Sequence, residues 1–233
     1  MLNSPISVEK LHRIIELFEL TQASRVFELG CGEGDFIRRV FDRWGANCHG
    51  LDPDVEALAY CRKQEDSAKL ILHASTGADF TWPAEPFDVA ACIGSSHALE
   101  GFVPTIKTLR DHVRPGGLIL MGDIYWRKRP EPAYEAFLGE GWPSFDIDHH
   151  AYVLAGENAG LISLYSVRSN ADEWDHFEGL FTMRNLRQAQ AISDETLRAK
   201  TIQKRKAWRD AYLKWGHATL GFGLYLFQKP LPE

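Results

Sequence analysis

The sequence predicts a doubly wound α/β fold, with helices on both faces of a mostly parallel sheet of about seven strands. Short apolar runs alternate with amphipathic stretches from residue 25 to residue 121. The runs are apolar at successive positions, which is typical of strands that are buried on both faces of a parallel sheet. A glycine-rich turn follows the first run and leads into a helical pattern. These features favour one α/β domain over residues 1–233.

The elements of the first half follow from periodicity and breakers. Ser7 is expected to cap a helix that runs to about residue 20, since apolar residues recur there at helical spacing. The run Arg114-Pro115-Gly116-Gly117 is expected to end a helix and turn the chain. The predicted strands are 25–29, 47–51 ending at Asp52, 69–73, 87–93 and 118–121, and the predicted helices between them are 36–44, 55–64 and 103–113.

The regular alternation of predicted strands and helices ends at about Gly122. Residues 125–150 are rich in Pro, Trp and Tyr and are expected to form a cover loop with short helices. Residues 171–217 are expected to form a second cover, or lid, over one end of the sheet. The remaining elements are predicted as helices at 150–159, 172–190 and 194–215 and strands at 161–167 and 221–227.

Composition places the chain among ordinary globular proteins. It has 233 residues, of which 45% are hydrophobic and 25% charged, and its formal net charge is −6. No apolar run approaches the roughly 20 residues that span a bilayer, and no signal-peptide pattern is visible, so we expect a cytoplasmic protein without a membrane partner. An acidic chain is not built around a broad phosphate-binding surface, which disfavours nucleic acid as a partner.

The cysteines predict neither disulfides nor a metal site. The four are Cys31, Cys48, Cys61 and Cys92, and none forms a C-x-x-C pair. We expect reduced, mostly buried thiols. The pair His149 and His150 has no further ligands at convincing spacing, so we predict no bound metal.

The strongest chemical signal is the turn after the first strand. Its sequence is Glu28-Leu29-Gly30-Cys31-Gly32-Glu33-Gly34. Glycines let the backbone approach a ligand closely, and a helix N-terminus offers free N–H groups. The spacing G-x-G-x-G departs from the dinucleotide pattern G-x-G-x-x-G. Glu28 would be awkward beside a pyrophosphate but suits a ligand with positive charge, while Asp52 can accept hydrogen bonds from ribose hydroxyls.

At these residues the chain resembles the class I S-adenosylmethionine-dependent methyltransferase family, over about residues 26–121. Further matching segments, in the family's order, are Gly50-Leu51-Asp52, Phe87-Asp88-Val89 and Arg114-Pro115-Gly116-Gly117-Leu118. The resemblance implies a Rossmann-like methyltransferase fold with an antiparallel last strand and S-adenosylmethionine as cofactor. It also implies methyl transfer as the activity.

The resemblance also implies roles for individual residues. Glu28 and the glycine turn would hold the amino-acid end of the cofactor, and Asp52 the ribose. Many relatives carry an acid after the third strand, where this chain has His73-Ala74-Ser75-Thr76. The expected cofactor residues are Glu28, Gly30, Cys31, Gly32, Gly34, Asp52, Pro53, Ala74, Ser75, Ile93 and Gly94.

Each carboxylate has a structural alternative. Glu28 could cap a helix or form an ion pair instead of contacting a ligand. Asp52 precedes Pro53-Asp54-Val55, and it could simply cap the following helix.

Residues for the acceptor side are less constrained, because methyl transfer needs a base only if the acceptor is protonated. His97 follows the fourth strand at the edge where α/β folds bind ligands, and its alternative role is packing beside the cofactor. Tyr125 and Trp126 follow the fifth strand and are expected in the cover. Glu178 and Asn185 share a helix face with Trp174 and Phe181, so we predict that they contact the acceptor, with structural hydrogen bonds as the alternative. The residues that we predict in catalysis are His97, Tyr125 and Glu178.

Several functions compete with methyl transfer to a small molecule. Residues 198–214 form a basic helix that could bind RNA, although a solvated surface explains it as well. A nicotinamide-dependent oxidoreductase would share the glycine turn and Asp52 but not Glu28. A protein that binds the cofactor without catalysis also remains possible.

Overall fold

A computed structural model describes residues 3–65, 67–139, 142, 144 and 147–232. Its centre is a seven-stranded sheet in the order β3-β2-β1-β4-β5-β7-β6. Only β7 runs antiparallel to its neighbours in the described sheet, so the expected topology is confirmed. The strands are β1 Arg25–Leu29, β2 Asn47–Asp52, β3 Leu70–Ala74, β4 Phe87–Ile93, β5 Val113–Trp126, β6 Ile162–Arg168 and β7 Leu220–Gln228.

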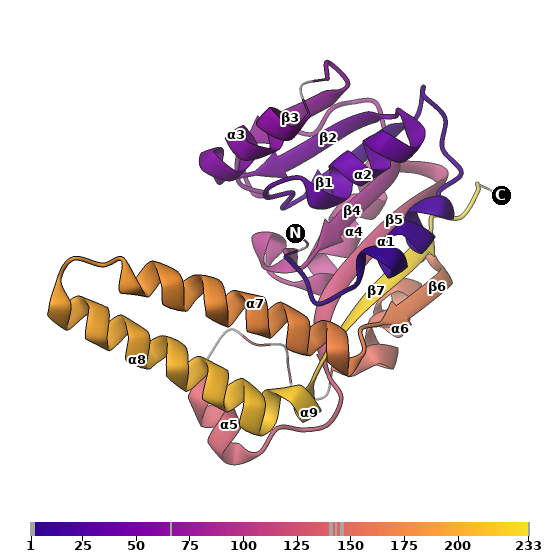
Figure 1. Cartoon of the computed structure of the whole chain (residues 1–233). Coiled ribbons are helices and arrows are strands. Elements are labelled where there is room, and N and C mark those ends of the chain that lie inside the picture. Colours follow the sequence, from indigo (N-terminus) through magenta and orange to yellow (C-terminus); the bar gives the residue numbers. More distant parts are fainter. Residues whose placement is uncertain (1–2, 66, 140–141, 143, 145–146, 233) are drawn as a thin grey trace.

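Helices cover both faces of the sheet and pack as two apolar layers (Figure 1). In one layer Val26 of β1 lies in the same apolar cluster as residues of α1, α2 and α3. In the other layer Phe27 shares a cluster with residues of α4 and α6. Successive strand residues point to opposite faces, which explains why the strands read as continuous apolar runs. The helices are α1 Val8–Glu16, α2 Asp35–Trp44, α3 Val55–Gln64, α4 Phe102–His112, α5 Pro132–Leu138, α6 His149–Asn158, α7 Ala171–Gln190, α8 Glu195–Ala211 and α9 His217–Thr219, with a short 3₁₀ turn at Ser96–Leu99 and a π turn at Tyr212–Gly216.

The fifth strand is longer at both ends than the sequence indicates. It begins at Val113, so the predicted turn at residues 114–117 lies inside the strand as an irregularity between β4 and β5. It continues through Tyr125 and Trp126, which pair with Gly221 and Leu220 of β7 and therefore do not belong to the cover loop. Backbone pairing with β7 overrides the local signals.

Two predicted helices also differ in length. The first ends at Glu16, four residues before the predicted end, where Leu17 caps it. The last long helix, α8, stops at Ala211 and continues as the π turn. Figure 1 shows α7 and α8 as a hairpin that extends away from the sheet, with α5 beside it. No helix in the described part of the chain is long and apolar enough to cross a membrane.

The four cysteines are buried and unpaired, as predicted. A less expected feature lies between β3 and β4, where residues 75–86 form a loop and not a helix. Phe80 and Trp82 of this loop pack on Phe27, and β2 and β3 contribute His49 and His73 to the same aromatic cluster. The His49 Nδ1 atom lies 3.2 Å from His73 Nε2.

This histidine pair predicts acid sensitivity. Burial and the neighbouring charge of His73 lower the pKa of His49 from 6.5 to about 4. The unfolded chain therefore takes up the proton first, and stability is lost as the pH falls from about 6.5 towards 4. We expect the thermal midpoint to fall more steeply over this interval in the native protein than in His49→Gln. Equal slopes would contradict this origin of the acid sensitivity.

Candidate functional site

The strand register brings the predicted cofactor residues to one edge of the sheet. Leu29 pairs with Leu51 and with Cys92, and Leu51 pairs with His73. The segments that follow β1, β2, β3 and β4 therefore meet at the carboxyl edge, where open α/β sheets bind ligands.

The glycine turn combines necessary packing with open space. Gly30, Gly32 and Gly34 have φ angles of 73°, 49° and 78°, a region that favours glycine. A Cβ on Gly30 would lie 2.3 Å from Ser95 Cβ, and one on Gly34 would lie 2.2 Å from Cys61 Sγ. A Cβ on Gly32 would meet nothing within 4 Å. Gly32 therefore borders a space that a ligand can enter.

Glu28 holds a buried carboxylate whose second oxygen has no protein partner. The residue is 4% exposed, and its Oε2 atom accepts no hydrogen bond from the described residues. Burial raises the pKa of Glu28 well above its usual value, while a hydrogen bond from the Ile37 backbone N–H opposes this shift. The structural alternative thus holds in part, since Glu28 bonds the first turn of α2. An orphaned buried oxygen is costly, and a ligand ammonium group would satisfy it.

Asp52 is tied to the glycine turn. Its Oδ2 atom accepts a 2.8 Å hydrogen bond from the Gly32 N–H, and its Oδ1 atom accepts one of 2.8 Å from the Asp54 N–H. Asp54, whose Oδ1 accepts from the N–H groups of Glu56 and Ala57, is the residue that caps α3. The alternative that Asp52 caps this helix is therefore wrong, and its carboxylate stands half-buried at the edge.

The other predicted cofactor residues differ in what they can offer. The Cys31 side chain is buried against β2, where a Cβ on Gly50 would lie 2.8 Å from its Sγ, so only the Cys31 backbone could face a ligand. Ala74 pairs with Asp52 across the β2–β3 ladder and is exposed, while the Ser75 hydroxyl donates to the Thr76 carbonyl at 3.2 Å. The remaining positions, Pro53, Ile93 and Gly94, are exposed or half-buried at the same edge.

On the acceptor side, sequence reasoning missed Asp123. This residue follows Gly122 on β5, and its Oδ2 atom accepts a short hydrogen bond from the Ser96 hydroxyl. The Ile124 N–H donates to its Oδ1 atom at 2.7 Å. Burial raises the pKa of Asp123, and the hydrogen bonds from Ser96 and Ile124, followed by the charge of the nearby His97, oppose that shift. A carboxylate directly after the apolar run at residues 118–122 was the available signal.

The N-terminal segment also reaches this edge. Ser4 is buried, and its Oγ atom lies 3.3 Å from the position of a Cβ on Gly94. His97 lies in the 3₁₀ turn after Gly94 and is exposed. No sequence pattern pointed to Ser4.

The other predicted acceptor residues lie in different surroundings. The Tyr125 ring packs over Gly221 of β7, where a Cβ would lie 2.3 Å from it. Glu178 of α7 is buried, and it accepts a 3.0 Å hydrogen bond from Trp208 Nε1 of α8. Burial raises the pKa of Glu178. Asn185 donates to the Phe181 carbonyl of its own helix at 2.7 Å. Acceptor contacts by these residues stay predictions.

Acidic side chains gather at this edge. Glu28, Asp52 and Asp123 lie on three different strands of it. Such a set suits a cationic ligand that brings several hydrogen-bond donors, because a nearby positive charge favours the ionised carboxylates, and it disfavours a pyrophosphate.

Comparisons with known proteins agree with this chemistry. A methyltransferase domain model matches residues 26–117. The protein YjhP of Escherichia coli K12 is 22% identical over 230 residues, which cover 96% of this chain and 92% of YjhP. A fatty-acid O-methyltransferase of Mycolicibacterium smegmatis is 26% identical over 229 residues, which cover 93% of this chain and 74% of that enzyme.

A solved structure shares the fold over nearly the whole chain. It is the crystal structure of a SAM-dependent methyltransferase from Thiobacillus denitrificans in complex with S-adenosyl-L-homocysteine. The TM-score is 0.87 at 23% identity, with 98% of this chain and 94% of that chain covered. The domain match and the curated relatives support a class I S-adenosylmethionine-dependent methyltransferase, and the strand order and the solved structure show the corresponding fold.

Proposed function

We propose that this enzyme transfers the methyl group of S-adenosylmethionine to a carboxylate oxygen of a small organic acid. The observation that carries the cofactor assignment is the buried Glu28 Oε2 atom without a partner among the described residues, on the strand that leads into the glycine turn, where Gly32 borders open space. The acceptor class is supported by the fatty-acid O-methyltransferase among the relatives. The buried, unpaired cysteines support a reducing, cytoplasmic location.

In this proposal Glu28 accepts a hydrogen bond from the ammonium group of the cofactor, and Asp52 accepts from its ribose hydroxyls. The cofactor supplies a methyl group on a positively charged sulfur. A carboxylate oxygen forms the new bond to the methyl carbon while the carbon–sulfur bond breaks and its electron pair stays on sulfur. The products are a methyl ester and S-adenosylhomocysteine, and no proton moves. The protein therefore contributes position and exclusion of water, and no base is required.

Calorimetry followed by a turnover assay tests the proposal. We expect S-adenosylmethionine to bind and NAD not to bind. We also expect label from the methyl group to appear as base-labile ester when fatty acids or short polycarboxylic acids are supplied. Binding of NAD alone would favour an oxidoreductase. Cofactor binding without transfer to any acid would contradict the acceptor class, and label in added RNA would support the competing RNA-methyltransferase function.

His97 is proposed to donate a hydrogen bond to the acceptor carboxylate, because it follows Gly94 at the edge beside Asp123. We expect His97→Ala to lower kcat/KM by about 10–100-fold, the value of a hydrogen bond to a charged group. Cofactor affinity should not change. His176→Ala, an exposed histidine of α7, is the matched control. Unchanged turnover in His97→Ala would remove this residue from the mechanism.

A further inference from the structure

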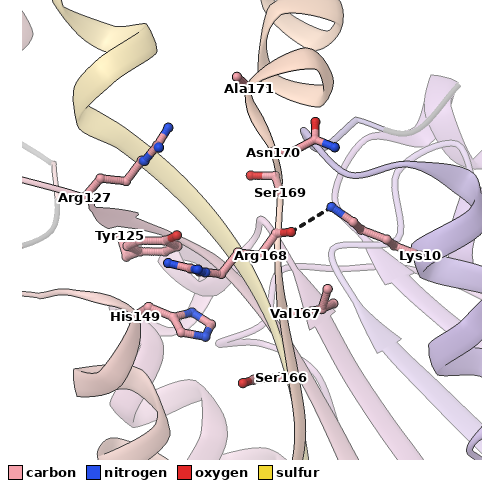
Figure 2. A pocket seen from close by; sticks show the side chains of 10 residues that line it. All are labelled: Lys10, Tyr125, Arg127, His149, Ser166, Val167, Arg168, Ser169, Asn170 and Ala171. Carbon is pink, nitrogen blue, oxygen red and sulfur yellow. Dashed lines mark hydrogen bonds between the residues drawn. The ribbon is translucent and has the colours of Figure 1, made fainter.

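A pocket with a volume of about 570 Å³ lies at the carboxyl ends of β5 and β6, apart from the cofactor residues. Figure 2 shows how Arg127 and Tyr125 of the β5 side, His149 of α6 and Arg168 of β6 surround it, with Lys10 of α1 across the strand. The wall is completed by Ser166, Val167, Ser169, Asn170 and Ala171. None of these residues belongs to the set that we assign to the cofactor.

The pocket is positively charged in an acidic protein. Lys10, Arg127 and Arg168 line it, and no Asp or Glu is among its lining residues. Lys10 is neutralised by Glu173, with 2.6 Å between Nζ and Oε2. In the described part of the chain, neither Arg127 nor Arg168 has a carboxylate partner, whereas the chain as a whole has a net charge of −6. Like charges brought together from distant parts of a chain repel one another unless an anion joins them.

The pocket also presents neutral hydrogen-bond donors and a helix N-terminus, both of which favour an anion. The Tyr125 hydroxyl and the His149 ring line the pocket with Arg168, whose charge opposes the burial that raises the pKa of Tyr125 and adds to the burial that lowers the pKa of His149. The 20-residue helix α7 begins at Ala171, so its positive end meets the pocket. The nearby acids are engaged or outside the wall: Asp148 caps α6, Glu173 bonds Lys10 and Asn170, and Asp172 is exposed in the first turn of α7.

We infer that this pocket binds a small molecule with a carboxylate or phosphate group, held by Arg127 and Arg168. Planar guanidinium groups match both anions with paired hydrogen bonds. The lining residues come from five elements, α1, β5, α6, β6 and α7, and from the segments next to them, and they meet without the cofactor. Binding is therefore expected with or without it, and the inference does not depend on the proposed methyl transfer.

Calorimetric titration of the full chain tests this site, with citrate and inorganic phosphate as separate probes and with or without saturating S-adenosylhomocysteine. We expect at least one probe to bind, and the tighter one identifies the class of ligand. Arg127→Gln/Arg168→Gln should weaken that binding about tenfold or more. The control Lys200→Gln/Lys204→Gln changes the net charge equally at two exposed positions of α8 and should bind as the native protein does.

The site would be disproved if neither probe bound, or if the double arginine variant and the lysine control bound equally well at the same ionic strength. Affinity for S-adenosylhomocysteine is measured in the same variants and should not change. Loss of S-adenosylhomocysteine binding with intact anion binding would count against the proposed function alone. Loss of anion binding with intact nucleoside binding would count against this pocket alone.

Discussion

Asp52→Ala is expected to weaken binding of S-adenosylmethionine by about 10–100-fold. The Asp52 carboxylate is proposed to accept from the ribose hydroxyls, and hydrogen bonds to a charged group contribute roughly 1.5–3 kcal/mol. The same carboxylate also holds the Gly32 N–H at 2.8 Å, so the variant loosens the turn beside the ligand. Calorimetric titration with S-adenosylhomocysteine measures the loss directly, without any acceptor.

Asp54→Ala is the matched control, since it removes a carboxylate two residues away. Asp54 caps α3 through the N–H groups of Glu56 and Ala57, so its loss should cost about 0.5–2 kcal/mol of stability. Its effect on affinity for the nucleoside should be small. If Asp52→Ala kept native affinity, or if Asp54→Ala lost as much, the ribose assignment would be wrong.

The sequence was sufficient to predict the sheet and the edge at which the proposed cofactor residues meet, because both depend on local patterns. Buried parallel strands are apolar at successive positions, and a chain turn after each of them must lie at one edge. The pairing of Leu29 with Leu51 and Cys92 confirms that arrangement. Glu28 and Asp52 could be singled out for the same reason, since each lies at or next to the end of a predicted strand.

Features that arise from long-range pairing could not be predicted. Residues 113–117 and 125–126 join β5 only because β4 and β7 lie alongside them. The pocket at the carboxyl ends of β5 and β6 is lined by Lys10, Arg127 and Arg168, which meet only in the folded chain. Glu178 illustrates a third limit, because helical spacing placed it on a buried face but could not reveal Trp208 as its partner.

Alanine substitutions in the glycine turn are the second change with a large expected effect, and they distinguish loss of stability from loss of ligand affinity. Gly30→Ala should destabilise the fold by about 2–5 kcal/mol, since it adds left-handed strain of about 1–2 kcal/mol to an overpacking cost of about 1–3 kcal/mol. The overpacking follows from the Ser95 Cβ atom, 2.3 Å from the new methyl group. That atom is fixed to the backbone and cannot rotate away, so the turn itself must move.

Gly32→Ala carries a similar φ penalty, at 49°, but meets nothing within 4 Å. We expect this variant to lose only about 1–2 kcal/mol of stability. Its affinity for the nucleoside should fall about tenfold or more, because the methyl group enters the space assigned to the ligand. Denaturant unfolding and calorimetry on both variants give the two quantities independently. Equal stability losses would show that Ser95 does not constrain Gly30, and native affinity in Gly32→Ala would place the ligand elsewhere. The two glycines thus divide the turn into a part that the fold requires and a part that the cofactor requires.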